Sequence, residues 1–157
     1  MPVTVLFLCF LIGCVTGLRS LTAPAAVCWG AHLGWLHFAG TRLAFLQHRT
    51  TLIIFTLLAL AELTADKLPN TPARTAPLGL TARVLVGGFC GAALSLSAGG
   101  GVVVAAIVGV LGALAGTFGG YNIRHALVAK AHLPDIAVAL AEDAVAIASG
   151  LLIVSHL

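Results

Sequence analysis

The sequence is poor in charged and in aromatic side chains. Only 8% of its 157 residues are Asp, Glu, Lys or Arg, and only 6% are Phe, Trp or Tyr. Because an average soluble domain carries about 25% charged residues, this composition excludes a soluble surface. The net charge of +3 is scattered and forms no basic stripe with interleaved aromatics, which nucleic-acid binding requires. We therefore predict an integral membrane protein whose partner is the lipid bilayer, with no nucleic-acid partner.

The sequence also lacks the motifs that indicate a reaction or a bound group. Its histidines form no HExxH pair, and its four cysteines form no CxxC pair. Ser149 precedes Gly150, but Ile147 and Leu151 stand where a nucleophile elbow needs glycines. These absences predict that the protein is not an enzyme and has no metal or cofactor site.

Apolar runs fill most of the sequence, which is 60% hydrophobic. Glycine, proline and charged residues divide these runs into six candidate helices, at 3–18, 22–38, 50–66, 81–97, 101–118 and 134–155. A crossing helix needs about 20 residues, and no polar stretch is long enough for a separate soluble domain. We predict one all-α domain over 1–157, a polytopic transmembrane helical bundle with about six membrane helices.

Two stretches depart from this simple pattern. The segment 22–38 contains Pro24 and is partly amphipathic, so it either crosses, lies at the interface, or enters and returns as a broken or re-entrant segment. The stretch 122–132 carries four basic or histidine side chains and is too polar to cross. We expect it to form an interfacial helix or a loop.

The basic residues predict an orientation in the membrane. With six spans, Arg42 and Arg49 fall on one side and six basic residues fall on the other. Lys and Arg favour the cytoplasmic side, so the side with six should be cytoplasmic. If the second segment does not cross, Arg19 changes side, but the loops at 67–83 and 124–130 stay together on the cytoplasmic side.

Four of the five acidic residues lie in two patches, and each patch contains one copy of the tetrapeptide Ala-Leu-Ala-Glu, at 59–62 and 139–142. Acids inside apolar helices are costly and typically mark an ion or substrate site. Glu62 and Asp66 are spaced i, i+4 on one helix face, where paired carboxylates can bind a cation or hold a proton. Asp143 follows Glu142, and adjacent helical residues point about 100° apart, so these two acids should contact different neighbours.

Basic residues near these acids are candidates for countercharge or for contact with an anionic group. They are Arg19, Lys67, Arg124 and Lys130. Two structural alternatives stay open: Asp66 and Lys67 end their helix among lipid headgroups, or Glu142 and Asp143 form ion pairs with Arg19 or Arg124.

Small residues form two ridges. Gly109, Gly112, Gly116 and Gly120 recur every three or four residues, as do Gly13 and Gly17 in the first segment. Such ridges allow close helix approach, either within one chain or in a homo-oligomer. Arg19 and Arg124 each follow a Gly-rich helix end, which together with the repeated tetrapeptide suggests two related halves, as in many transporters.

The segment from Glu62 through Asp66-Lys67-Leu68-Pro69, followed by Arg74-Thr75, Arg83, Arg124 and Glu142-Asp143, resembles the bacterial membrane family called domain of unknown function 4126. The opening at 17–25 is also similar to that family, whereas 28–51 shows no match. The resemblance implies an inner-membrane protein and no particular activity.

From the residues we therefore expect a carrier of a small solute or ion, with Glu62, Asp66, Glu142 and Asp143 as proton or cation sites. The alternative is a non-transport membrane component, a lipid-binding or assembly subunit, in which the same charges form structural ion pairs.

Overall fold

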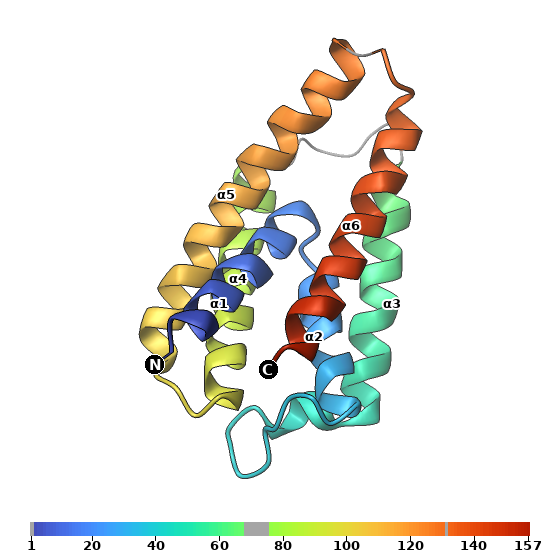
Figure 1. Ribbon diagram of the computed structural model, residues 1–157. Coiled ribbons are helices and arrows are strands. Elements are labelled where there is room, and N and C mark those ends of the chain that lie inside the picture. The colour runs from blue at the N-terminus through green and yellow to red at the C-terminus, as the bar shows by residue number, and fades with distance from the viewer. Residues whose placement is uncertain (1, 68–75, 131) are drawn as a thin grey trace.

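A computed structural model describes residues 2–67, 76–130 and 132–157 of the chain. Within these residues the structure is helical throughout and has no strand. Successive α-helices run in opposite directions along an elongated bundle (Figure 1). The elements are α1 (Val3–Leu18), α2 (Thr22–His32), the 3-10 helix η1 (Ala44–Gln47), α3 (Arg49–Ala65), α4 (Pro77–Ser97), α5 (Val102–Ala129) and α6 (Asp135–Ser155).

For the first and last helices, the predicted bounds agree closely with the structure. The first helix has the predicted bounds, and α6 begins one residue later than predicted, with Pro134 as its N-cap and Asp135 in its first turn. A carboxylate in the first turn suits the helix dipole. Helix α4 begins four residues earlier than predicted, because Pro77 occupies the first helical position.

The fifth helix is longer than predicted. It continues without a break to Ala129, and the Lys130 backbone nitrogen still donates to the Ala126 oxygen at 3.0 Å. The expectation of a separate interfacial helix or loop over 122–132 is therefore wrong. No proline or glycine lies between Gly120 and Pro134, so nothing in the local sequence stops the helix, and polarity alone does not end one.

The second helix is much shorter than predicted. It has 11 residues, which span about 16 Å at 1.5 Å per residue, roughly half the hydrocarbon core of a bilayer. The helix ends near Gly34, which adopts a φ of +81°, and the backbone nitrogens of Trp35 and Leu36 both donate to the Gly30 oxygen. The prediction of one helix over 22–38 is wrong, and the interruption expected as the alternative is present.

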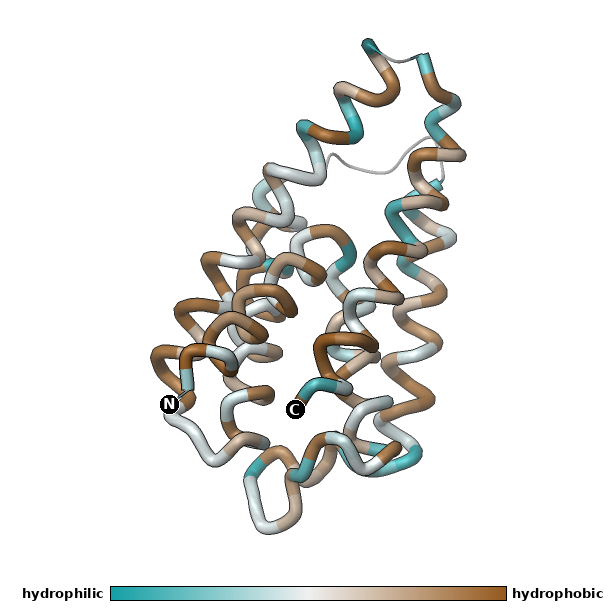
Figure 2. Tube along the Cα trace, viewed as in Figure 1, coloured by the Kyte–Doolittle hydropathy of each residue, from teal (hydrophilic) through white to brown (hydrophobic). Residues whose placement is uncertain are grey.

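Among the described residues, three helices are long and apolar enough to cross a membrane by length and composition. They are α4, α5 and α6, with 21, 28 and 21 residues, and α1 is a shorter apolar helix. Hydrophobic colour dominates along the lengths of the helices, and hydrophilic colour gathers at the two ends of the bundle (Figure 2). These features are those of a membrane protein with lipid around its helices.

Small residues pack α5 against α1 and α4, the closest helix contacts in the structure. A Cβ added to Gly17 of α1 would lie 2.5 Å from the backbone nitrogen of Thr117, and Gly112 and Gly116 meet the backbone of α1 directly. Gly109 faces α4 in the same way. The glycine ridges are thus used within the chain, and a homo-oligomer stays a prediction.

The remaining helices form a second group around α2, which packs against both α3 and α6. Helices α5 and α6 extend past the turn between α1 and α2, so this turn lies part-way along the bundle (Figure 1).

Candidate functional site

The turn between α1 and α2 carries a fully buried arginine. Helix α1 ends at Leu18, and Arg19 follows with a side-chain exposure of 0%. Its Nε donates to Asp143 Oδ1 at 2.7 Å, and its Nη2 lies 2.6 Å from the same oxygen. Its Nη1 forms an ion pair with Asp66 at the end of α3. One guanidinium therefore joins α1, α3 and α6.

Asp143 of α6 is shared by two cations. Its Oδ1 receives Arg19, and its Oδ2 lies 2.8 Å from Lys67 Nζ. The Lys67 ammonium also donates to the Leu63 oxygen at 3.0 Å, in the last turn of α3. The side chain of Lys67 is 24% exposed, whereas that of Asp143 is 9% exposed. Asp143 thus has one fully buried partner, Arg19, and one partly exposed partner, Lys67.

Glu62 holds the start of α2. Its two carboxylate oxygens accept hydrogen bonds from the backbone nitrogens of Ser20 and Leu21, each at 2.8 Å. These donors lie in the turn just before α2, which begins at Thr22 with Leu21 as its N-cap, and the dipole at this end of the helix favours a negative charge. Glu62 therefore works as a helix cap supplied by another helix. We call Arg19, Glu62, Asp66, Lys67 and Asp143 the turn cluster.

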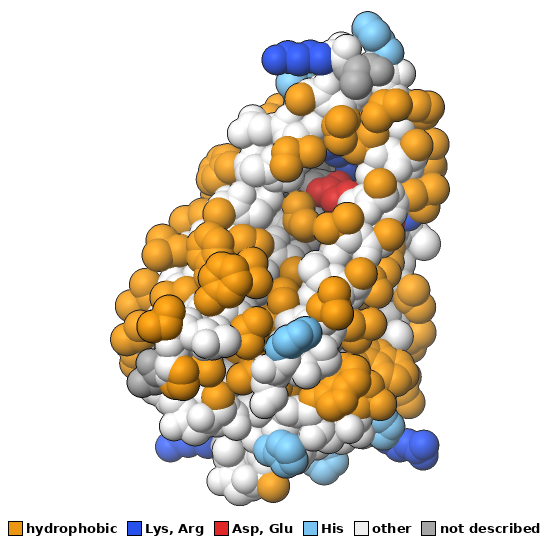
Figure 3. All heavy atoms as spheres, viewed as in Figure 1, with side chains coloured by type: hydrophobic (Ala, Val, Ile, Leu, Met, Phe, Trp, Pro, Cys, Tyr) orange, Lys and Arg blue, Asp and Glu red, His pale blue; other side chains and the backbone are white. Residues whose placement is uncertain are grey.

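A second set of charges joins α5 to α6. Arg124 forms two hydrogen bonds with Asp135, at 2.9 and 2.8 Å, and its Nη1 lies 3.8 Å from Glu142 Oε2. Arg124 and Glu142 line a cleft of 410 Å³ whose other walls are apolar. An acidic side chain is visible in a hollow between hydrophobic side chains of α5 and α6 (Figure 3).

The domain of unknown function DUF4126 matches residues 6–156. The chain belongs to this family. The match covers nearly the whole sequence, including 28–51, and it confirms the resemblance drawn from the acidic and basic motifs. No curated protein and no solved structure matches the chain. Since the DUF4126 description assigns no activity, function must be argued from the geometry.

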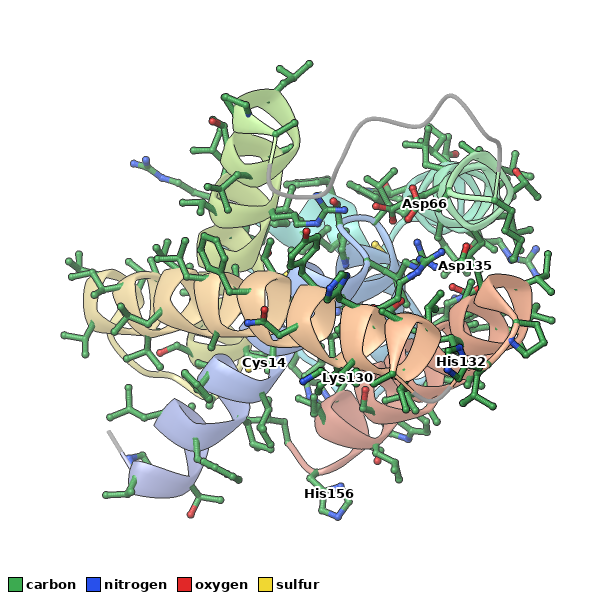
Figure 4. The ribbon with its side chains drawn as sticks, turned by 90° about the horizontal axis from the view of Figure 1, so that it is seen from above. Cys14, Asp66, Lys130, His132, Asp135 and His156 are labelled. Carbon is green, nitrogen blue, oxygen red and sulfur yellow. The ribbon has the colours of Figure 1, made fainter. Side chains whose placement is uncertain are left out.

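In this DUF4126 member the predicted site residues gather at one end of the bundle. Asp66, at the end of α3, and Asp135, in the first turn of α6, lie on the same side of the bundle when it is seen from above (Figure 4). All five acids of the chain belong to the two ion-paired sets. Lys130 instead is exposed at the C-cap of α5 and makes no ion pair within the described residues.

The prediction that Glu142 and Asp143 contact different neighbours is confirmed. Asp143 meets Arg19 from α1, and Glu142 faces Arg124 from α5. The reading in which Asp66 and Lys67 only end their helix is wrong, because both contact buried charges of the turn cluster. Two other motif positions, Pro69 and Arg74, lie outside the described residues.

Sequence reasoning missed two parts of the arrangement. Asp135 was not among the candidate site residues, yet it accepts two hydrogen bonds from Arg124. The backbone nitrogens of Ser20 and Leu21 carry no sequence signal for a distant cap. Arg19 pairs with Asp66 at the end of α3 as well as with Asp143 of α6, whereas Arg124 pairs only with acids of α6 among the described residues, so the two arginines do not have equivalent partners.

Proposed function

We propose that this DUF4126 protein is a multi-pass protein of the bacterial inner membrane that carries protons or small cations, with Asp143 as the carrier group. The membrane placement rests on the three long apolar helices. The orientation rests on the basic residues, since Lys67 and Arg124 lie at the end that holds the charge sets, while Arg49 begins α3 at the opposite end. The positive-inside rule makes the first end cytoplasmic.

The lengths of the helices support this placement. Helix α5 has 28 residues, about 42 Å, which exceeds the hydrocarbon core by about 12 Å. Its Arg124 is 22 residues beyond Val102, or about 33 Å along the helix. The charge sets then lie close to the cytoplasmic boundary, and the last turns of α5 extend past it. In this arrangement α1 and α2 form a hairpin whose turn is held just inside that boundary.

The observation that carries the proposal is the double partnership of Asp143. Oδ1 of this buried carboxylate binds the fully buried Arg19, and Oδ2 binds the partly exposed Lys67. Such a carboxylate is suited to exchange its lysine partner for a proton or a cation. When Lys67 moves toward solvent, Oδ2 becomes open to a proton or a cation, while Arg19 keeps the carboxylate in position. The turn cluster holds three carboxylates and two basic side chains, so one added positive charge balances it.

Binding at Asp143 would also change the attraction that holds the hairpin. A neutralised Asp143 binds Arg19 less strongly, and Arg19 connects the turn to both α3 and α6. A ligand shifts a conformational equilibrium by its different affinity for two states. Loading of Asp143 would therefore favour a state in which the turn between α1 and α2 moves away from α6.

The proposal is tested by ion flux in proteoliposomes. The purified protein is reconstituted in phosphatidylethanolamine and phosphatidylglycerol vesicles with an internal pH dye, and imposed proton, Na⁺ and K⁺ gradients are compared. We expect Asp143→Asn to abolish flux and Asp135→Asn, which changes an exposed acid, to retain it. Folded yield by gel filtration is measured for each variant.

A second variant tests whether Lys67 exchanges with the carried cation or only forms a structural ion pair with Asp143. Lys67→Arg keeps a positive charge next to Asp143, but a guanidinium does not lose its proton and forms a firmer fork with a carboxylate. Exchange predicts slower flux in a well-folded Lys67→Arg protein, whereas a structural ion pair predicts no change. Absence of flux in the parent protein under all three gradients would refute the carrier.

The non-transport alternative is favoured by a different observation, the cap made by Glu62. Both of its oxygens accept backbone hydrogen bonds, so this acid serves the fold. If the parent protein shows no flux and variants of the turn cluster fail to fold, the charges are structural and the protein is a lipid-binding or assembly subunit.

A further inference from the structure

A second cavity of the molecule lies away from the charge sets, between α2, α3 and α6. Its volume is 390 Å³, and its walls include Trp29, Trp35, Thr22, Thr56 and Ile147. We call it the tryptophan pocket. None of its lining residues is ionisable, in contrast to the cleft beside Arg124 and Glu142. A pocket of this size with mostly apolar walls and a few polar groups is typical of small-molecule sites.

One polar group of this pocket has no hydrogen-bond partner among the described residues. The Oγ1 atom of Thr22 is buried and unpartnered, in a residue that is 5% exposed. A buried hydroxyl without a partner costs free energy, so native proteins rarely keep one without a reason.

Other threonines of the helices do not share this condition. Thr16, Thr56 and Thr117 each donate to the backbone oxygen four residues earlier, at 2.9, 2.7 and 2.8 Å. Thr22 is the first residue of α2, and the residue four positions earlier is Leu18, at the end of α1 before the chain reverses. The reversal removes the usual partner, and the hydroxyl is buried in a residue that lines the pocket.

The indole nitrogen of Trp29 already has a hydrogen-bond partner. The Trp29 indole nitrogen donates to Thr56 Oγ1 at 3.2 Å, and that hydroxyl donates to the Leu52 oxygen. The Trp29 ring is therefore oriented by a hydrogen bond, and its apolar surface is left for contact. The pocket then offers apolar walls, two indole rings and one unused hydroxyl.

We propose that the tryptophan pocket binds a neutral lipophilic molecule that carries one hydrogen-bonding oxygen, a carbonyl or a hydroxyl. The absence of ionisable walls disfavours a charged ligand, because burying an unpaired charge is costly. Rotation about χ1 exchanges the methyl and hydroxyl groups of Thr22 and brings Oγ1 to the pocket surface, where it bonds the ligand oxygen. The proposal is independent of ion transport.

Intrinsic fluorescence reports on this pocket specifically, because the chain contains two tryptophans and both line it. The full chain in phosphatidylcholine nanodiscs is titrated with menadione, a neutral quinone that quenches tryptophan. We expect quenching that saturates. Two colourless competitors, 2-decalone and decalin, are then compared at equal concentration in the lipid, since they differ by one carbonyl oxygen.

We expect 2-decalone to displace menadione at about 3- to 10-fold lower concentration than decalin, the ratio that one neutral hydrogen bond provides. Thr22→Val should remove this difference and keep the affinity for decalin. The control is Thr81→Val, because Thr81 is exposed and bonds its own helix at Pro77, and it should keep the difference.

Two results would overturn the proposal. Quenching that rises linearly with the quinone content of the lipid would mean that lipid chains fill the pocket and no site exists. A preference for 2-decalone that survives Thr22→Val would mean that another group provides the hydrogen bond. Flux variants such as Asp143→Asn should leave the fluorescence titration unchanged, so the two proposals fail separately.

Discussion

Replacing Arg19 by methionine should destabilise the protein strongly, because the arginine is the common partner of two acids from different helices. The change removes the cation that faces Asp66 and Asp143 and leaves an apolar side chain of similar length beside them. Removing one partner of a buried ion pair costs about 3–5 kcal/mol, since the other charge stays buried without compensation.

A second substitution tests the cause of this loss. Asp143 keeps Lys67 as a partner in Arg19→Met, so Asp66 is the acid that loses its ion pair. Adding Asp66→Asn removes the uncompensated charge, and the double variant should be more stable than Arg19→Met by about 1–3 kcal/mol. Loss of packing alone would give no such recovery.

The assay is reversible unfolding in dodecylmaltoside with increasing SDS, followed by helical circular dichroism. Arg49→Met serves as the control, because Arg49 is exposed at the start of α3, and it should change stability by less than about 0.5 kcal/mol. If Arg19→Met also lies within about 1 kcal/mol of the parent, the pairs behave like exposed ones, and the reasoning about the buried guanidinium is refuted.

Two other substitutions probe the packing and the cap with the same unfolding assay. Gly116→Ala should cost about 1–3 kcal/mol of stability, since its new methyl group would collide with the α1 backbone at Cys14. Gly119→Ala meets nothing within 4 Å and should be neutral or stabilising. Equal effects of the two substitutions would contradict the packing argument. Glu62→Gln should cost about 1–3 kcal/mol of stability, because an amide has one acceptor oxygen for the two N–H groups that the carboxylate now binds. The amide also has no negative charge to interact with the helix dipole. Unchanged stability would show that water caps α2 equally well.

The sequence predicted the bounds of the first and last helices nearly correctly, and a proline, Pro2 or Pro134, precedes the first residue of each. Gly119 and Gly120 were taken as the end of the fifth helix, but α5 continues through them to Ala129.

The sequence also failed where tertiary contacts decide the path of the chain. Leu36 and Phe38 are apolar and were included in the second helix, yet both are fully buried in the segment after the turn at Gly34. An apolar run shows that residues are buried, and it does not show that they are helical.

The sequence predicted which residues form the candidate site better than it predicted which of them contact each other. Rarity of acids in apolar helices identified Glu62, Glu142 and Asp143, and the angle between adjacent residues predicted that the last two diverge. Spacing along one helix could not show that Asp66 turns toward Arg19, 47 residues earlier in the chain (66 − 19 = 47). It also could not assign Glu62 to backbone donors, since these exist at every helix start.

The two groups of helices are held by different interactions, glycine packing in one and ion pairs in the other, and this difference bears on function. Helices α1, α4 and α5 pack through glycines with close backbone contact, which requires no charge. The turn of the hairpin, in contrast, is held against α3 and α6 by ion pairs. Apolar packing stabilises a buried interface at least as well as an ion pair does, and the chain uses such packing elsewhere. Stability alone therefore does not require the buried pair of Arg19 and Asp143, whereas the proposed carrier would use that carboxylate to bind and release a positive charge.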